Sequence, residues 1–246
     1  MLLSVIMPAY NEQSSIAQVL HRVCTVALPP GVEREVVVVD DCSMDGTWET
    51  LIAFQQQNPQ FPIRSFRQAK NLGKGAALRR AIQEARGDYI VVQDADLEYD
   101  PAEYTLLLDP VLKGHADVVY GSRFMGGNPH RILFFWHSIG NKFLTFLSNM
   151  FTNLNLTDME TCYKLFRADI LKRIRLQENR FGFEPEVTAK MARFPGVRVY
   201  EVGISYYGRT YAEGKKINWK DGLWAIWCIL KYNTWARQTF FPEIAT

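Results

Sequence analysis

The sequence predicts an α/β fold in which a mostly parallel β-sheet is covered by helices on both faces. Two observations indicate this class. Along the first half of the chain, short apolar runs rich in β-branched residues alternate with amphipathic runs of helical spacing. The apolar runs are hydrophobic at consecutive positions, which is typical of strands buried on both faces of a parallel sheet. We therefore expect three layers, with the sheet between two layers of helices.

The first two predicted strands are each followed by a predicted helix. Residues 3–10 (LSVIMPAY) form an apolar strand that ends at a turn, and residues 13–27 follow with apolar side chains at helical spacing. Residues 35–41 (EVVVVDD) are a β-branched run that ends in two acids, as expected for a buried parallel strand. Residues 45–57 begin with Asp, Gly and Thr, which are suitable helix caps, and predict the second helix.

Three more strands and two more helices complete the predicted sheet. Residues 62–68 are expected to form a short third strand, and residues 73–87 a helix that ends at a glycine. Residues 88–96 (DYIVVQDAD) predict the fourth strand, residues 101–113 another helix, and residues 116–122 (ADVVYGS) the fifth strand.

The alternation changes beyond residue 125. Residues 131–154 are rich in aromatic side chains that recur at steps of three and four, which predicts an amphipathic helix. Residues 217–238 carry four tryptophans and two lysines, a composition common at membrane interfaces. Both segments suit helices that lie on a membrane surface, although core packing or a dimer contact would explain the same pattern. We predict one domain over residues 1–216, followed by an amphipathic helical extension over residues 217–246.

Composition and charge argue against several classes of protein. The chain has 246 residues, of which 48% are hydrophobic, enough for one large domain or two small ones. Lys and Arg number 28 and Asp and Glu 26, so we expect no nucleic-acid partner. The four cysteines contain no CxxC pair, so we expect reduced thiols in a cytoplasmic protein and no zinc site. No run of about 18 uncharged apolar residues occurs, and the N-terminus lacks a basic leader, so neither a spanning helix nor a signal peptide is expected.

Four of the predicted strands end in residues that carry chemistry. Ligands of open α/β sheets bind outside the carboxyl ends of the strands, so these residues are expected to share one site. A turn would explain one acidic pair, but not the repetition along the chain. The four strand ends are Tyr10–Glu12, Asp40–Asp41, Asp94–Asp96 and Gly121–Arg123.

Asp94, Asp96 and Glu98 form an all-oxygen cluster after the fourth strand. Hard divalent cations such as Mg²⁺ and Mn²⁺ prefer oxygen ligands and are often shared with substrate phosphates. One such ion would relieve the repulsion among the three carboxylates. The alternative is a simple turn in which Asp94 caps the helix near Pro101.

The second strand and residues 71–78 carry weaker signals. We expect Asp40 to bind ribose hydroxyls, as acidic residues do in nucleotide-binding sheets, and Asp41 to shape the turn that follows. Residues 71–78 (NLGKGAAL) look like a phosphate loop but lack its full Gly-x-x-x-x-Gly-Lys-Ser/Thr pattern, which argues against an ATPase. Its glycines are instead expected to allow a tight turn close to a nucleotide.

Five short motifs coincide with these sites: PAYNE (8–12), VDDCSMDGT (39–47), NLGKG (71–75), DADLEYDP (94–101) and GSRF (121–124). In combination they resemble the motifs of family 2 glycosyltransferases of GT-A fold, with the greatest likeness to the dolichyl- or polyprenyl-phosphate mannose synthase group. The resemblance covers roughly residues 1–217. It implies a Rossmann-like three-layer sandwich with a mixed sheet, in which a late strand around residues 160–166 runs antiparallel.

The resemblance also implies roles for individual residues. Asp96 and Glu98 would hold Mg²⁺ or Mn²⁺, and Asp96 would be needed for catalysis. Arg123 and Arg209 would bind phosphate groups of the donor or the acceptor and take part in catalysis. The nucleotide sugar, a GDP- or UDP-hexose, would be bound by Pro8, Tyr10, Glu12, Asp40, Asp94, Ala95 and Lys215.

The acceptor is expected to be a polyprenyl phosphate. Relatives with a hydroxyl acceptor often use a Glu-Asp pair as a base, and residues 158–164 (DMETCYK) contain no such pair. A phosphate monoester has a second pKa of about 6, so it is already nucleophilic at neutral pH and needs cations more than a base. Arg123 and Arg131 are the residues expected to bind it. We therefore predict a metal-dependent inverting transfer of mannose or glucose onto a dolichyl-type phosphate, by a cytoplasmic protein peripherally bound to a membrane.

Two alternatives stay open. If Asp158 or Glu160 acts as a base, the acceptor would be a hydroxyl of a saccharide or a glycerolipid. A nucleotide-sugar-binding protein without turnover is the third hypothesis, and the intact acidic cluster argues against it.

Overall fold

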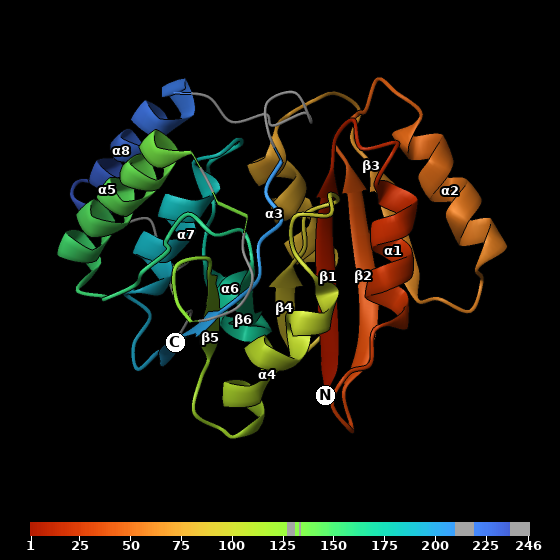
Figure 1. Ribbon diagram of the computed structural model, residues 1–246, viewed down its shortest axis with the longest axis horizontal. Helices are drawn as coiled ribbons and strands as arrows, with labels where there is room; N and C mark the ends of the chain where they lie inside the picture. The colour runs from red at the N-terminus through yellow and green to blue at the C-terminus, as the bar shows by residue number, and fades with distance from the viewer. Residues whose placement is uncertain (127–130, 133, 210–218, 237–246) are drawn as a thin grey trace, which may run out of the picture.

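A seven-stranded sheet in the order β3-β2-β1-β4-β6-β5-β7 forms the centre of the computed structural model, which describes residues 1–126, 131–132, 134–209 and 219–236 (Figure 1). Strand β6 runs antiparallel between β4 and β5, and the other neighbouring strands are parallel. The strands are β1 (Leu2–Ala9), β2 (Glu33–Asp40), β3 (Ile63–Arg67), β4 (Tyr89–Val92), β5 (Val118–Ser122), β6 (Lys164–Arg167) and β7 (Val199–Gly203).

Helices cover both faces of the sheet because the strand side chains alternate between two hydrophobic cores. Val36 and Val38 of β2 belong to the core shared with α1, α2 and α4, whereas Val37 and Val39 belong to the core shared with α3, α6 and α7. Each fully buried aliphatic side chain contributes about 1.5–3 kcal/mol. The helices are α1 (Ile16–Thr25), α2 (Thr47–Gln57), α3 (Lys74–Glu84), the 3₁₀ turn η1 (Pro101–Glu103), α4 (Tyr104–Leu112), α5 (Phe135–Thr152), α6 (Ala168–Arg173), α7 (Phe183–Met191) and α8 (Trp219–Asn233).

The sheet confirms the predicted α/β class and the antiparallel late strand. In β6, Leu165 pairs with Val91 of β4 on one side and with Val119 of β5 on the other, antiparallel in both cases. The predicted fourth strand is shorter than expected, because β4 ends at Val92 and the acidic residues lie in the turns beyond it. The alternation of a strand therefore does not orient those carboxylates. The sequence analysis did not identify α6, α7 or β7.

Helices α5 and α8 pack against each other at one end of the molecule, beside α7 (Figure 1). The inner face of α8 joins the protein core, since Cys228, Ile229 and Tyr232 are buried. The outer faces of the pair expose large apolar side chains, such as Trp136 on α5 and Trp219 on α8. None of the helices in the described residues is long and apolar enough to cross a bilayer.

Candidate active site

A cavity of about 300 Å³ opens at the carboxyl ends of the central strands, at the edge of the sheet where the sequence predicts a site. Its size lies at the lower end of the range for small-ligand sites. Most of the predicted site residues line it, although they come from segments far apart in the chain. They are Pro8, Tyr10, Glu12, Asp94, Ala95, Asp96, Glu98, Arg123 and Arg209.

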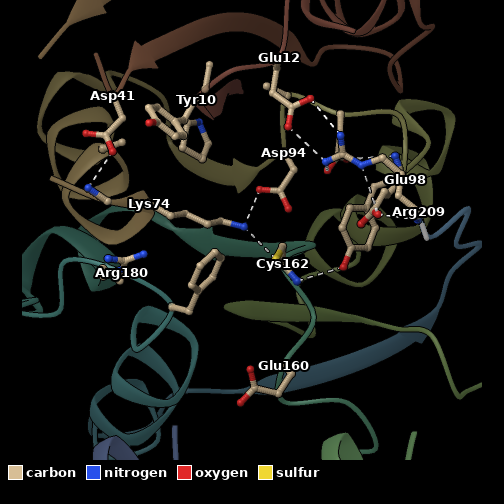
Figure 2. Close-up of a pocket in the computed structure, with 18 of the residues that line it drawn as sticks. Tyr10, Glu12, Asp41, Lys74, Asp94, Glu98, Glu160, Cys162, Arg180 and Arg209 are labelled. Atoms are coloured by element: carbon tan, nitrogen blue, oxygen red, sulfur yellow. Dashed lines mark hydrogen bonds and ion pairs between the residues drawn. The ribbon is translucent and has the colours of Figure 1, made fainter. Parts of the chain in front are cut away.

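The guanidinium of Arg209 lies among three carboxylates in the wall of this cavity (Figure 2). Its Nη1 is 3.1 Å from Glu12 Oε2, its Nη2 is 2.7 Å from Asp96 Oδ2, and its Nε is 3.5 Å from Glu98 Oε1. Burial alone would lower the pKa of Arg209, but the charge of Asp96, together with those of Glu12 and Glu98, raises it above its usual value. The guanidinium therefore stays charged and neutralises much of the acidic cluster.

Asp96 is a buried acid of this cluster whose pKa is raised. Burial raises the pKa of Asp96 to about 7, and the neighbouring charges of Asp94 and Glu98 add to the effect. The backbone N–H of Glu98 donates a 3.0 Å hydrogen bond to Asp96 Oδ1, so the turn fixes the position of the Asp96 carboxylate. The repulsion that the sequence predicts is therefore present in the fold.

The three carboxylates that surround Arg209 are of a type that suits a hard metal cation, although in this structure their positive partner is the guanidinium of Arg209. In the described part of the chain, no group of three or more His, Cys, Asp or Glu side chains is arranged to hold a metal ion. The carboxylates of Glu12, Asp96 and Glu98 are arranged around the guanidinium instead. Their donors are all oxygen, which is the ligand type that Mg²⁺ and Mn²⁺ prefer.

Lys74, at the start of α3, is a second cation of the cavity, and the sequence analysis gave it no role. Its Nζ is 2.6 Å from Asp94 Oδ1 and donates a hydrogen bond to Cys162 Sγ at 2.9 Å. Burial alone would lower the pKa of Lys74, but the charge and hydrogen bond of Asp94, together with the effects of Cys162 and Glu184, raise that pKa above its usual value. Asp94 is thus held as an ion pair and does not cap the next helix. Asp100 does so, by accepting a 3.0 Å hydrogen bond from the backbone N–H of Ala102.

Two glycines before and within α3 allow another segment to approach the cavity. Gly73 adopts a φ of +99°, and a Cβ on Gly75 would lie 2.4 Å from the backbone oxygen of Glu178. The segment that starts at Glu178 brings Arg180 and Phe181 to the cavity wall. These two residues carry no local motif, so the sequence analysis missed them.

Asp41, rather than Asp40, lines the described cavity, and the expectation that Asp40 binds ribose hydroxyls stays a prediction. Asp40 is fully buried; it accepts a hydrogen bond from the Ser43 backbone and forms an ion pair with Arg67 at 3.2 Å. Asp41 Oδ2 accepts a 2.7 Å hydrogen bond from the backbone N–H of Gly73, and burial raises the pKa of Asp41. Because side chains alternate along a strand, a shift of one residue exchanges the side chain that points inward for the one that faces the site.

Arg123 and Asp158 form a buried bidentate pair at the cavity. Arg123 donates from Nε to Asp158 Oδ2 at 2.6 Å and from Nη2 to Asp158 Oδ1 at 2.7 Å, and Asn141 also donates to Oδ1 at 3.3 Å. Burial alone would lower the pKa of Arg123, but the charge of Asp158 raises it well above its usual value. Asp158 is fully occupied by these contacts, which argues against its role as a base.

Arg131 does not line the described cavity, and Lys215 lies outside the described residues. Arg131 is absent from its wall; instead its Nη1 donates to the backbone oxygen of Gly208 at 2.9 Å, and its backbone N–H donates to that of Tyr206 at 2.8 Å. In the described structure this arginine holds the segment that precedes Arg209, and its assignment to the acceptor phosphate stays a prediction. Lys215 lies outside the described residues, so its assignment stays a prediction.

Glu160 lines the cavity, and Figure 2 marks no hydrogen bond or ion pair between its carboxyl group and the other residues drawn. Its Oε1 is shielded from solvent and has no hydrogen-bond partner in the described structure. Burial raises the pKa of Glu160 to about 7, and the charge of Glu184 adds to the effect. This carboxyl is therefore able to take up or release a proton near neutral pH.

Solved structures share this fold. A glucosyl-3-phosphoglycerate synthase from Mycobacterium tuberculosis, in complex with Mn²⁺, UDP and its product, superposes with a TM-score of 0.66 at 20% identity, covering 98% of this chain and 81% of that one. A mannosyltransferase from Pyrobaculum calidifontis, in complex with GDP-Man and Mn²⁺, gives a TM-score of 0.58 at 20% identity over 83% of this chain and 55% of that one. At this level of identity the likeness shows the GT-A fold alone.

Sequence relatives are more specific. The chain is 31% identical to an undecaprenyl-phosphate mannosyltransferase from Micrococcus luteus over 85% of both chains. It is 28% identical to a dolichol-phosphate mannosyltransferase from Pyrococcus furiosus over 88% of this chain, and it spans 61% of the length of that relative. It also spans 61% of a dodecaprenyl-phosphate galacturonate synthase from Rhizobium johnstonii, at 25% identity over 87% of this chain. The model of glycosyl transferase family 2 matches residues 4–175. The chain therefore belongs to glycosyl transferase family 2.

Proposed function

We propose that this protein transfers a hexose from a nucleoside-diphosphate sugar to the phosphate of a polyprenyl phosphate, with inversion and with the help of a divalent cation. The family and the names of its relatives support this class of reaction. The cavity supports it independently, because cations and carboxylates suited to two phosphate-bearing ligands line one space.

The observation that carries the proposal is the state of Arg123. Its Nε and Nη2 are held by Asp158, whereas its Nη1 makes no hydrogen bond to the described residues. Its guanidinium also lies 5.2 Å from the centre of the Tyr206 ring, which fixes its plane. A rigid guanidinium with a free donor at a cavity wall suits a phosphate oxygen.

The donor diphosphate is proposed to lie nearer to Lys74, Arg180 and Arg209, the other cations that line the cavity. Their fixed positive charges would stabilise the negative charge that develops on the departing diphosphate. Asp96 and Glu98 are the residues that would hold Mg²⁺ or Mn²⁺, whose positive charge supplies further stabilisation of that leaving group.

In the proposed reaction, an oxygen of the acceptor phosphate attacks the anomeric carbon from the face opposite the diphosphate. The new bond joins that carbon to the phosphate oxygen, and the electron pair of the broken bond leaves with the nucleoside diphosphate. No proton has to be removed, because a phosphate monoester with a second pKa of about 6 is mostly a dianion at neutral pH.

The experiment that tests this function measures release of nucleoside diphosphate from a panel of GDP- and UDP-hexoses, with and without a polyprenyl phosphate. We expect release to require the lipid phosphate and a divalent cation. Release with the corresponding polyprenol or a glycolipid, and none with the phosphate, would refute the proposed acceptor. No release under any condition would favour a nucleotide-sugar-binding protein.

A hydroxyl acceptor is the second candidate, and Glu160 is the observation that favours it. A cavity carboxyl whose pKa is raised to about 7 by burial is suited to proton transfer at neutral pH. Asp158, the other candidate base, is occupied by Arg123. A hydroxyl acceptor therefore requires Glu160 as a base, whereas a phosphate acceptor needs no base.

We further propose that the α5/α8 pair contacts a membrane surface from the cytoplasm, where a lipid phosphate would be reached. Exposed aromatic side chains on both helices support membrane contact, with exposed fractions of 79% for Trp136 and 72% for Trp219. All four cysteines are free thiols, in agreement with a reducing compartment.

A further inference from the structure

Glu160 presents an unsatisfied carboxyl oxygen at the wall of the cavity. The residue lies in the segment between α5 and β6, and its Oε1 is shielded from solvent without a hydrogen-bond partner in the described structure. Buried polar atoms in folded proteins almost always have a partner. A buried oxygen without a partner at a ligand cavity therefore indicates that a bound ligand supplies the missing hydrogen bond.

Four charged groups surround Glu160 and largely cancel one another. Arg123 follows β5, Lys164 lies on β6, Glu184 lies on α7, and Asp158 precedes Glu160 in the same segment. Each of the two cations already has its own partner, because Arg123 pairs with Asp158 and Lys164 pairs with Glu184. The charges of both cations are therefore largely balanced by their own partners, and they only partly offset the effect of burial on the pKa of Glu160.

We propose that Glu160 binds the acceptor phosphate in its protonated form, as a hydrogen-bond donor beside Arg123, so that binding of the acceptor is coupled to the uptake of one proton from solvent by Glu160. This inference rests on the proposed function, because it assumes a phosphate acceptor.

The charge of the acceptor favours the protonated form. A phosphate dianion next to an ionised carboxylate would be repelled, and the charge of Arg123 is already shared with Asp158. A neutral carboxylic acid removes this repulsion, and its O–H can donate a short, strong hydrogen bond to a phosphate oxygen. Burial has already raised the pKa of Glu160 to about 7, so the proton is taken up at little cost near neutral pH.

The reaction cycle neither consumes nor releases this proton overall. The Glu160 carboxylate takes one proton from solvent as the dianionic acceptor binds. Transfer of the hexose turns the phosphate monoester into a diester, which carries one negative charge less. When the diester leaves, Glu160 returns the proton to solvent, and the reaction needs no other reactant.

Isothermal titration calorimetry with farnesyl phosphate, a short polyprenyl phosphate, tests this inference directly. At pH 8 the ligand is already a dianion, so the dependence of the binding enthalpy on the ionisation enthalpy of the buffer counts protons taken up by the protein. We expect the wild-type protein to take up close to one proton per ligand and Glu160→Gln close to none. Glu33→Gln, a control at an exposed position, should behave as the wild type.

The affinity for farnesyl phosphate gives a second readout. If only the protonated form binds, the dissociation constant of the wild type should increase about fivefold between pH 7 and pH 8, whereas that of Glu160→Gln should change little. Because Gln keeps a donor of similar shape, Glu160→Gln should retain turnover at pH 7. Glu160→Ala, which lacks any donor, should bind about tenfold more weakly at pH 7.

The outcomes separate this inference from the function on which it rests. Equal proton uptake by the wild type and Glu160→Gln overturns the inference and leaves the phosphate acceptor intact. A folded Glu160→Gln that binds farnesyl phosphate but has lost turnover also overturns it and identifies Glu160 as a base. Failure of the folded wild type to bind farnesyl phosphate at any pH overturns both the inference and the proposed acceptor.

Discussion

Replacing Asp158 by Asn removes the charge that pairs with Arg123 while keeping the size and shape of the side chain. The pair is buried, with side-chain exposures of 0% for Asp158 and 11% for Arg123. Asp158 accepts from Nε, Nη2 and the backbone N–H of Arg123, at 2.6, 2.7 and 3.1 Å. The substitution therefore leaves a guanidinium that is desolvated and has lost its counter-charge.

The magnitude follows from this burial. Removing one partner of a buried ion pair costs about 3–5 kcal/mol, and the amide oxygen of Asn retains part of the hydrogen bonding, so we expect about 3 kcal/mol. For a chain of this length that loss lowers the melting temperature by about 6–12 °C. Turnover should fall together with stability, because Arg123 is no longer held in place at the cavity.

The assay is urea unfolding of the wild type, Asp158→Asn, Arg123→Met and the double variant. The double variant should be less destabilised than the sum of the two single variants, since neither charge is left unpaired. Asp109→Asn is a matched control, because its pair with Lys113 is about 60% exposed on both sides and should matter by less than about 0.5 kcal/mol. An Asp158→Asn protein with unchanged stability and no turnover would refute the reasoning and show that Asp158 acts as a base.

Three further predictions concern the metal, the glycine contact and the membrane. Asp96→Ala should abolish turnover that depends on a divalent cation and weaken Mn²⁺ binding measured by calorimetry; a folded variant with a near-normal rate would contradict the metal assignment. Gly75→Ala should cost about 1–3 kcal/mol in urea unfolding and weaken binding of nucleoside diphosphate, because the new Cβ would lie 2.4 Å from a backbone oxygen. Gly140→Ala is its control, since no atom lies within 4 Å of a Cβ there and alanine suits a helix. The protein should pellet with anionic vesicles at low salt, and Trp136→Ser should reduce the bound fraction severalfold while Leu106→Ser on α4 should not; equal binding by both variants would remove α5 from the proposed membrane contact.

The order of the elements in the first half of the chain was predictable because the central strands β1, β2, β4 and β5 are buried on both faces and therefore largely apolar. The run of valines in β2 is the clearest case, since the side chains of consecutive valines pack into the two cores on opposite faces of the sheet. The antiparallel β6 was not predictable from this pattern, because a buried strand looks the same in either direction; it was implied by the family resemblance alone. The short helices α6 and α7 lacked a long enough periodic pattern to be identified.

The acidic side of the site was predictable, whereas its neighbours were not. Asp94, Asp96 and Glu98 lie within five residues of one another and follow a strand, so the local conformation of this turn is enough to bring their carboxylates to the same site. The sequence did not identify Asp41 as the residue that lines the cavity, because the choice between two adjacent acids depends on one step of register. Arg180 and Phe181 reach the cavity through contacts between distant segments, for which no local pattern exists.

The position of Arg209 has a consequence for the order in which ligands arrive. Three carboxylates already have a counterion that is tethered to the same polypeptide, so any free cation that enters must outcompete it at a high effective concentration. A diphosphate offers the guanidinium another anionic partner and so weakens that competition. Nucleotide sugar and divalent cation should therefore each lower the dissociation constant of the other by the same factor. In Arg209→Gln this factor should fall to about one, because the competing guanidinium is absent.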